Sequence, residues 1–241
     1  MNNLFFLEKK DEIRDFPLTN TSISDLRLVS LIFVSCAYFV FNILYVPSHL
    51  SLIFSIIYSF LPIVIYFFIY YFVTKESPIK MYKKWSFYDL KIGIVFLVLQ
   101  LIYVSVISRL VPNMSANETV NIYSKVPHTL KNFSLISFTT IGNLMLEEIF
   151  SIIIFIALFK LLSYKFSRET AIGIALVLSS IVFGLMHFQA YNWHLAQMIL
   201  LIGGERLFLT GAYIRTKNIW TSFLMHYIFD MTIFLLVFLQ N

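Results

Sequence analysis

Long runs of apolar residues, separated by short polar segments, recur along most of the chain. About 20 apolar residues in a helix cross the roughly 30 Å hydrocarbon core of a bilayer. The pattern therefore predicts an all-α fold, a polytopic transmembrane helical bundle of about seven spans. The predicted spans are 28–46, 51–73, 92–111, 135–159, 171–187, 195–214 and 220–239. We divide the chain into a polar N-terminal segment (1–27), three spans with their loops (28–134) and a final set of four spans (135–241).

The distribution of Lys and Arg predicts which side of the membrane each loop faces. Basic residues gather before the first span and in the loops after the second, fourth and sixth spans. The loops on the other side hold Lys125 and Lys131, with Arg109 near a helix end. Because cytoplasmic loops carry an excess of basic residues, we expect the N-terminus to lie in the cytoplasm.

The amino-acid composition indicates where the protein is located and which partners it has. The chain has 241 residues, of which 59% are hydrophobic and 13% charged, more apolar surface than a soluble domain of this size can bury. We expect a multi-pass protein of the cell (plasma) membrane, with the lipid bilayer as a partner. We attribute the net charge of +5 to the basic loops on the cytoplasmic side, and we expect no nucleic-acid partner. A single cysteine excludes an intrachain disulfide framework.

Few ionisable residues fall inside the predicted spans, and such residues are costly in a bilayer and usually functional. They are Glu147, Glu148, His187, Glu205, Arg206, His226 and Asp230. A rise of about 1.5 Å per residue puts Glu147, Arg206 and Asp230 near the membrane midplane. The same rise puts His187 about 24 Å from the start of its span, too near the outer side. Either that helix begins later and continues through Gln189, or the helices tilt.

Three interpretations fit this polar set. Buried carboxylates can pair with buried cations and fix helix packing. A small ion-coupled transporter would also place carboxylates and histidines at the midplane, but its usual broken helices and paired halves are not visible. Peptide-bond hydrolysis needs a carboxylate as general base, an imidazole that orients water, and donors for an oxyanion. The chain supplies all three groups from different spans.

Three short motifs follow one another on successive predicted spans: Glu147-Glu148, FGLMH at 183–187 and HYIFD at 226–230. In order and spacing they resemble the CPBP (Abi) family of intramembrane proteases. That family includes CAAX prenyl endoproteases and bacterial proteins linked to bacteriocin immunity and peptide-pheromone maturation. The likeness covers roughly 135–230, and the first three spans carry no family signature.

The resemblance implies a role for each motif residue. Glu147 would activate the water together with His187, and His226 and Asp230 would hold the oxyanion. To donate a hydrogen bond there, Asp230 must carry a proton. The family was described first as metal-dependent and later as glutamate-dependent. Since the chain has no HExxH helix and its spacing does not support a zinc site, we expect no metal and no cofactor.

The resemblance also implies two supporting residues, Glu148, which orients the site, and Phe183, which packs its face. The family pattern has an Arg four residues after the glutamate pair, where this chain has Ile152. We hypothesise that Arg206, at matching depth, replaces it as the cation for Glu148. Alternatively, Arg206 pairs only with Glu205 or lines a water-filled cavity.

The expected activity is that of an intramembrane endopeptidase. It would cleave a hydrophobic membrane-associated peptide or membrane protein, such as a bacteriocin or pheromone precursor, by glutamate-activated water. The alternative is a non-catalytic protein of the same fold that confers bacteriocin self-immunity or acts as a membrane scaffold. The missing Arg favours the alternative, and the retained Glu147, His187, His226 and Asp230 oppose it.

Overall fold

The computed structural model describes residues 4–10, 14–45 and 52–240. The predicted span limits at 46 and 51 lie outside the described residues. All regular elements in the described ranges are helical: α1 (Asp25–Leu44), α2 (Leu52–Thr74), the 3-10 helix η1 (Pro78–Met81), α3 (Phe87–Leu110), α4 (Glu118–Ser124), α5 (Leu130–Leu162), α6 (Arg168–Leu185), the π-helix η2 (Gln197–Gly203), α7 (Gly204–Thr216) and α8 (Ile219–Leu239). The predicted all-helical class is confirmed.

Side chains at the helix ends explain where these helices begin. Ser24, Thr129, Ser167 and Asn218 each accept a backbone N–H of the first turn that has no partner inside the helix. At α3 the cap is reciprocal, because Ser86 accepts from the backbone of its helix and a first-turn carboxylate accepts from the backbone of Ser86. Polar residues at the ends of apolar runs thus set the helix limits.

Five of the helices are long and apolar enough to cross a membrane: α1, α2, α3, α6 and α8. The predicted spans 135–159 and 195–214 correspond to the middle of α5 and to the continuous pair η2–α7. These long apolar helices are typical of a membrane protein. The count of seven spans and the cytoplasmic N-terminus stay predictions.

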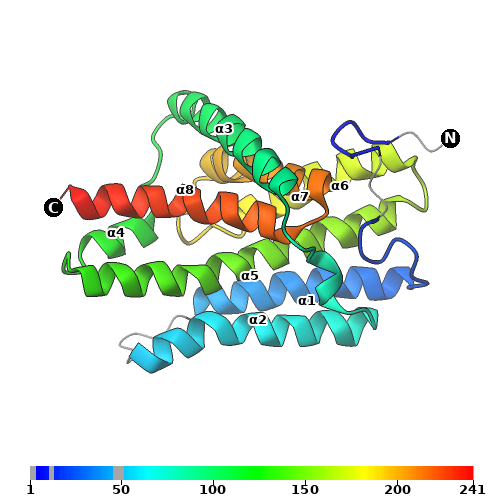
Figure 1. Ribbon diagram of the computed structural model, residues 1–241, viewed down its shortest axis with the longest axis horizontal. Coiled ribbons are helices and arrows are strands. Elements are labelled where there is room, and N and C mark those ends of the chain that lie inside the picture. Colours follow the sequence, from blue (N-terminus) through cyan, green and yellow to red (C-terminus); the bar gives the residue numbers. More distant parts are fainter. Residues whose placement is uncertain (1–3, 11–13, 46–51, 241) are drawn as a thin grey trace.

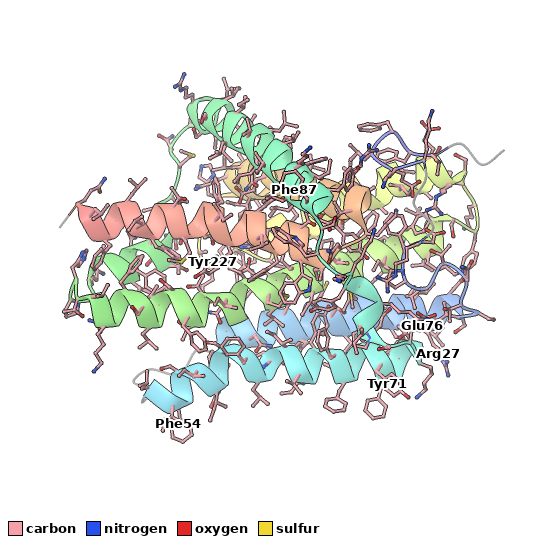
Figure 2. The ribbon with its side chains drawn as sticks, in the orientation of Figure 1. Arg27, Phe54, Tyr71, Glu76, Phe87 and Tyr227 are labelled. Carbon is pink, nitrogen blue, oxygen red and sulfur yellow. The ribbon has the colours of Figure 1, made fainter. Side chains whose placement is uncertain are left out.

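Helix α5 is the centre of the bundle (Figure 1). It contacts α1, α2, α6 and α8, while α3 lies obliquely across α7 and α8. Residues 148–157 of this helix are all buried, including Ile152, which stands where the family pattern has Arg. The outer helices instead present apolar side chains outward, as Figure 2 shows for Phe54 and Tyr71. That arrangement suits a bundle surrounded by lipid.

Helix α6 and the π-helix η2 approach each other closely at a glycine. A Cβ on Gly184 would collide with the backbone carbonyl of Met198, so only glycine allows this contact without movement. On the facing side, Gly203 lies against the backbone of Ser180. The close approach holds the end of α6, and the turn that follows it, beside α7. π-helical turns are frequent at functional sites.

The polar N-terminal segment packs against the starts and ends of later helices. Phe5, Phe16 and Leu18 are buried in the common core. Arg168 at the start of α6 donates two hydrogen bonds to Glu8, at 2.9 and 2.7 Å, and Lys217 after α7 donates a third at 2.9 Å. In Figure 1 this segment lies at the end of the bundle opposite the C-terminus. The segment therefore ties α6 to the α7–α8 turn.

The ion cluster around Glu8 predicts an acid-sensitive contribution to stability. Burial alone would raise the pKa of Glu8, but hydrogen bonds from Arg168 and Lys217 outweigh it and lower the pKa to about 2. A carboxyl with a lowered folded-state pKa stabilises the fold above its unfolded value, near 4.5, and loses that contribution as pH falls toward 2.

We expect Glu8→Gln to cost about 2 kcal/mol of unfolding free energy at pH 7 and almost nothing near pH 2. Thermal unfolding of both proteins in detergent across pH 2–7 measures the difference. A difference that stays constant over that range would show that the Glu8 carboxylate does not stabilise the fold electrostatically.

Candidate active site

The polar residues predicted at membrane depth come together where α5, α6, α7 and α8 meet. Helix α5 supplies two neighbouring glutamates from its middle, and the turn after α6 supplies His187. Helix α7 supplies Arg206. Helix α8 supplies His226 and Asp230, which share a face because they are four residues apart. The structure thus gathers all seven predicted residues, Phe183 included, around one site.

Glu147 faces two histidines. Its Oε2 lies 3.8 Å from Nε2 of His187 and 3.8 Å from Nε2 of His226. The Glu147 side chain is 22% exposed and that of His187 is 19% exposed, so this part of the site is accessible. Both separations are longer than a direct hydrogen bond and suit groups that are bridged by a small molecule such as water.

Glu148, the next residue, points the other way and is completely buried. Two nitrogens of Arg206 donate to its two oxygens, one of them at 2.9 Å, and Nδ1 of His226 lies 2.8 Å from Oε1. Arg206 is also wholly buried, and it reaches Thr210 at 3.3 Å and stacks over Phe183 at 4.9 Å. Bidentate pairing of this kind fixes both partners in orientation as well as charge.

These contacts place Arg206 where our hypothesis put the replacement cation for Glu148. The alternative that Arg206 pairs only with Glu205 is wrong, because its guanidinium binds Glu148. Ile152, the position of the family's Arg, contributes apolar packing instead. The cation comes from α7 rather than from α5 itself.

His187 is oriented by the backbone of α6. Its Nδ1 lies 2.9 Å from the carbonyl oxygen of Phe183, so Nδ1 carries the hydrogen and Nε2 offers its lone pair to the site. The Phe183 ring lies 4.6 Å from the imidazole. Helix α6 begins at Arg168 and ends at Leu185, so His187 lies in the turn that follows the helix. The alternative of a later helix that continues through Gln189 is therefore wrong.

His226 joins the buried and accessible halves of the site. One ring nitrogen, Nδ1, contacts the buried Glu148 carboxylate, and the other, Nε2, faces Glu147 and lies 3.9 Å from Oδ2 of Asp230. Asp230 is 26% exposed and so belongs to the accessible half. The ring of His226 is thereby held by a group that substrate does not reach.

Residues 129–232 match the sequence model of the family described as type II CAAX prenyl endopeptidase Rce1-like. This segment belongs to the CPBP family. The Rce1-like segment starts at the cap of α5 and ends just after Asp230, so it contains the whole site. The match supports a protease at a coarse level, of CAAX type and within the membrane. No curated protein and no solved structure matches the chain.

A catalytic metal ion would need several His, Cys, Asp or Glu side chains that face a common point. Within the described residues, no group of three or more His, Cys, Asp or Glu side chains is arranged to hold one. The expectation that the reaction needs no metal stays a prediction.

Two polar side chains near the site were not predicted from the sequence. Thr210 contacts Arg206 and follows it by four residues, and Tyr191 follows His187 by four residues. Extending the four-residue spacing by one helical turn from Arg206 would have found Thr210, whereas Tyr191 lies in the irregular turn after α6, where helical spacing gives no signal.

Proposed function

We propose that this protein is an intramembrane endopeptidase in which Glu147 activates water. The observation that supports the proposal is the contrast between neighbouring carboxylates. Glu148 is buried and fully paired with Arg206 and His226, whereas Glu147 is accessible and faces two imidazole nitrogens at 3.8 Å. A structural ion pair would explain Glu148 alone, so the accessible Glu147 needs a chemical role.

In the proposed reaction, a water molecule lies between Glu147 and His187. Glu147 accepts a proton from the water. At the same time the water oxygen forms a bond with the carbonyl carbon of the peptide, and the π-electron pair moves to the carbonyl oxygen. The tetrahedral intermediate then collapses, and the C–N bond breaks. The proton held by Glu147 passes to the leaving amine, so the carboxylate is regenerated.

Charge develops on the carbonyl oxygen during this reaction, and donors must meet it. Nδ1–H of His226 is held by the Glu148 carboxylate, so His226 would donate to the oxyanion from Nε2–H in its doubly protonated form. Asp230 lies beside that nitrogen at 3.9 Å and would donate in its protonated form. Arg206 has no direct part in the reaction; it holds Glu148, and Glu148 holds His226.

The proposed substrate is a hydrophobic peptide or a membrane-protein segment, of the kind found in bacteriocin and pheromone precursors. The support is the position of the site among membrane-spanning helices and the apolar outer surface of the bundle. The proposed location is the cell membrane, and the proposed reaction needs no cofactor.

A mass-spectrometric cleavage assay tests the proposed function. Purified protein in detergent is incubated with a panel of hydrophobic peptides in ¹⁸O-labelled water, with and without EDTA, beside Glu147→Gln. We expect fragments whose new carboxyl group carries one ¹⁸O, made with EDTA present and absent with Glu147→Gln. Identical products from folded wild type and Glu147→Gln would favour the immunity or scaffold function, and loss of cleavage in EDTA would favour a metal.

A further inference from the structure

Tyr191 lies in the turn after α6, one turn beyond His187. Its backbone N–H donates to the carbonyl oxygen of His187 at 3.2 Å, and the two rings lie 6.4 Å apart. The tyrosine is 8% exposed, although it lies outside any regular helix. A buried phenol needs hydrogen-bond partners, and those of Tyr191 show what its hydroxyl can do.

The hydroxyl oxygen of Tyr191 accepts a hydrogen bond from Asn117 at 2.8 Å. The orientation of the Asn117 amide is fixed, because its Oδ1 caps α4 by accepting from the backbone of Thr119 at 2.8 Å and of Val120 at 3.3 Å. Its Nδ2 is therefore the atom that meets Tyr191, and it can only donate. The hydroxyl hydrogen of Tyr191 must consequently point elsewhere.

The segment that carries Asn117 is firmly attached to the turn that carries Tyr191. The backbone N–H of Glu118 donates to the carbonyl of Ala190 at 3.2 Å. The side chain of Gln197, at the start of η2, bonds both to the N–H of Ser115, at 2.8 Å, and to its carbonyl, at 3.1 Å. Three separate links thus hold this loop over the turn, so Tyr191 is positioned rather than free to rotate.

Tyr191 borders the accessible half of the site. Its ring lies 6.4 Å from that of His187, whose Nε2 lies 3.8 Å from Oε2 of Glu147. Nε2 of His226 lies 3.8 Å from the same Glu147 oxygen and 3.9 Å from Oδ2 of Asp230. Because the Tyr191 oxygen already accepts a hydrogen bond from Asn117, its own hydrogen can be donated to a group that enters this region.

We propose that the Tyr191 hydroxyl is a further catalytic residue, which donates a hydrogen bond to the oxyanion beside His226 and Asp230. This inference rests on the proposed function. Asn117 is the positioning residue, because its amide fixes the direction of the donated hydrogen. The loop 111–117 and the α6–η2 turn thereby become part of the active site, outside the motifs that the sequence revealed.

The test compares Tyr191→Phe with wild type, using Tyr38→Phe as the matched control, since the Tyr38 hydroxyl bonds to Pro62 away from the site. Removing one oxyanion donor lowers kcat by about 10²-fold or more. We expect that loss for Tyr191→Phe with KM within about twofold, and wild-type kinetics for Tyr38→Phe. The kcat of Asn117→Ala should lie between those of Tyr191→Phe and Tyr38→Phe, because loss of the amide leaves the Tyr191 hydroxyl free to turn.

A binding measurement separates catalysis from support of the fold. A peptide phosphonate imitates the charged tetrahedral intermediate, and the same peptide with a reduced, uncleavable bond imitates only the substrate. Tyr191→Phe should weaken binding of the phosphonate by about the factor lost in kcat. Binding of the reduced peptide should stay unchanged.

Three results would overturn the inference. Wild-type kcat in Tyr191→Phe, with Glu147→Gln inactive, would refute it and leave the proposed function standing. If Tyr191→Phe bound both peptides more weakly by the same factor and melted at a lower temperature, Tyr191 would have a structural role. A wild-type protein that neither cleaves peptides nor prefers the phosphonate would overturn the proposed function and this inference with it.

Discussion

Glu147→Gln is expected to lower kcat by about 10³-fold while the protein stays folded, because the amide cannot take a proton from water at neutral pH. Gln has nearly the same size and keeps one oxygen toward His187 and His226. Peptide binding should therefore change little, and the loss should appear in kcat rather than in KM. Single-turnover cleavage followed by mass spectrometry measures the step directly.

The control for Glu147→Gln is Glu169→Gln, which makes the same chemical change at an exposed position in the first turn of α6. It should cleave at the wild-type rate. If Glu147→Gln kept more than a tenth of the wild-type kcat, Glu147 would not be the general base, and the base would have to be sought among His187 and Asp230.

Arg206→Leu is expected to abolish cleavage and to destabilise the fold by about 3–5 kcal/mol, because it leaves the Glu148 carboxylate buried without its cation. Glu148 is wholly buried, so water cannot replace the guanidinium without opening the bundle. Thermal unfolding in detergent and the peptide assay measure the two effects on the same sample. Unchanged melting and cleavage would show that the pair contributes to neither.

Two companion variants separate the charge from the chemistry at this pair. Adding Glu148→Gln to Arg206→Leu removes the unpaired charge, so stability should recover in part. Cleavage should stay absent, because His226 then lacks the carboxylate that orients its ring. Glu205→Gln should keep cleaving, since Arg206 binds Glu148 and not Glu205.

Much of the helical fold was predictable, because apolar runs are a local signal. The ends were less so: α5 spans Leu130–Leu162, whereas hydropathy alone predicts 135–159. Its first turns carry polar residues and begin at the Thr129 cap, which a hydropathy pattern does not register. Likewise, the sequence shows a polar N-terminal segment but not its attachment through Glu8, since Arg168 lies 160 residues away.

The candidate site shows the same limit at the scale of single residues. The motifs identify Glu147 and Glu148, but they do not tell which one is accessible. Adjacent residues on a helix point about 100° apart, and only the packing of α7 and α8 decides that Glu148 is enclosed. The bond between Asn117 and Tyr191 joins residues 74 positions apart on irregular backbone, where no periodic pattern can reveal it.

The position of the cation also bears on how the bundle assembles in the membrane. An Arg four residues after Glu148 could neutralise it inside a single helix as that helix enters the bilayer. Here the partner lies 58 residues away on α7, so α5 carries an uncompensated carboxylate until α7 joins it. We therefore expect the insertion of α5 to depend on that of α7, with the pairing of Glu148 and Arg206 completing the core formed by α5, α6, α7 and α8.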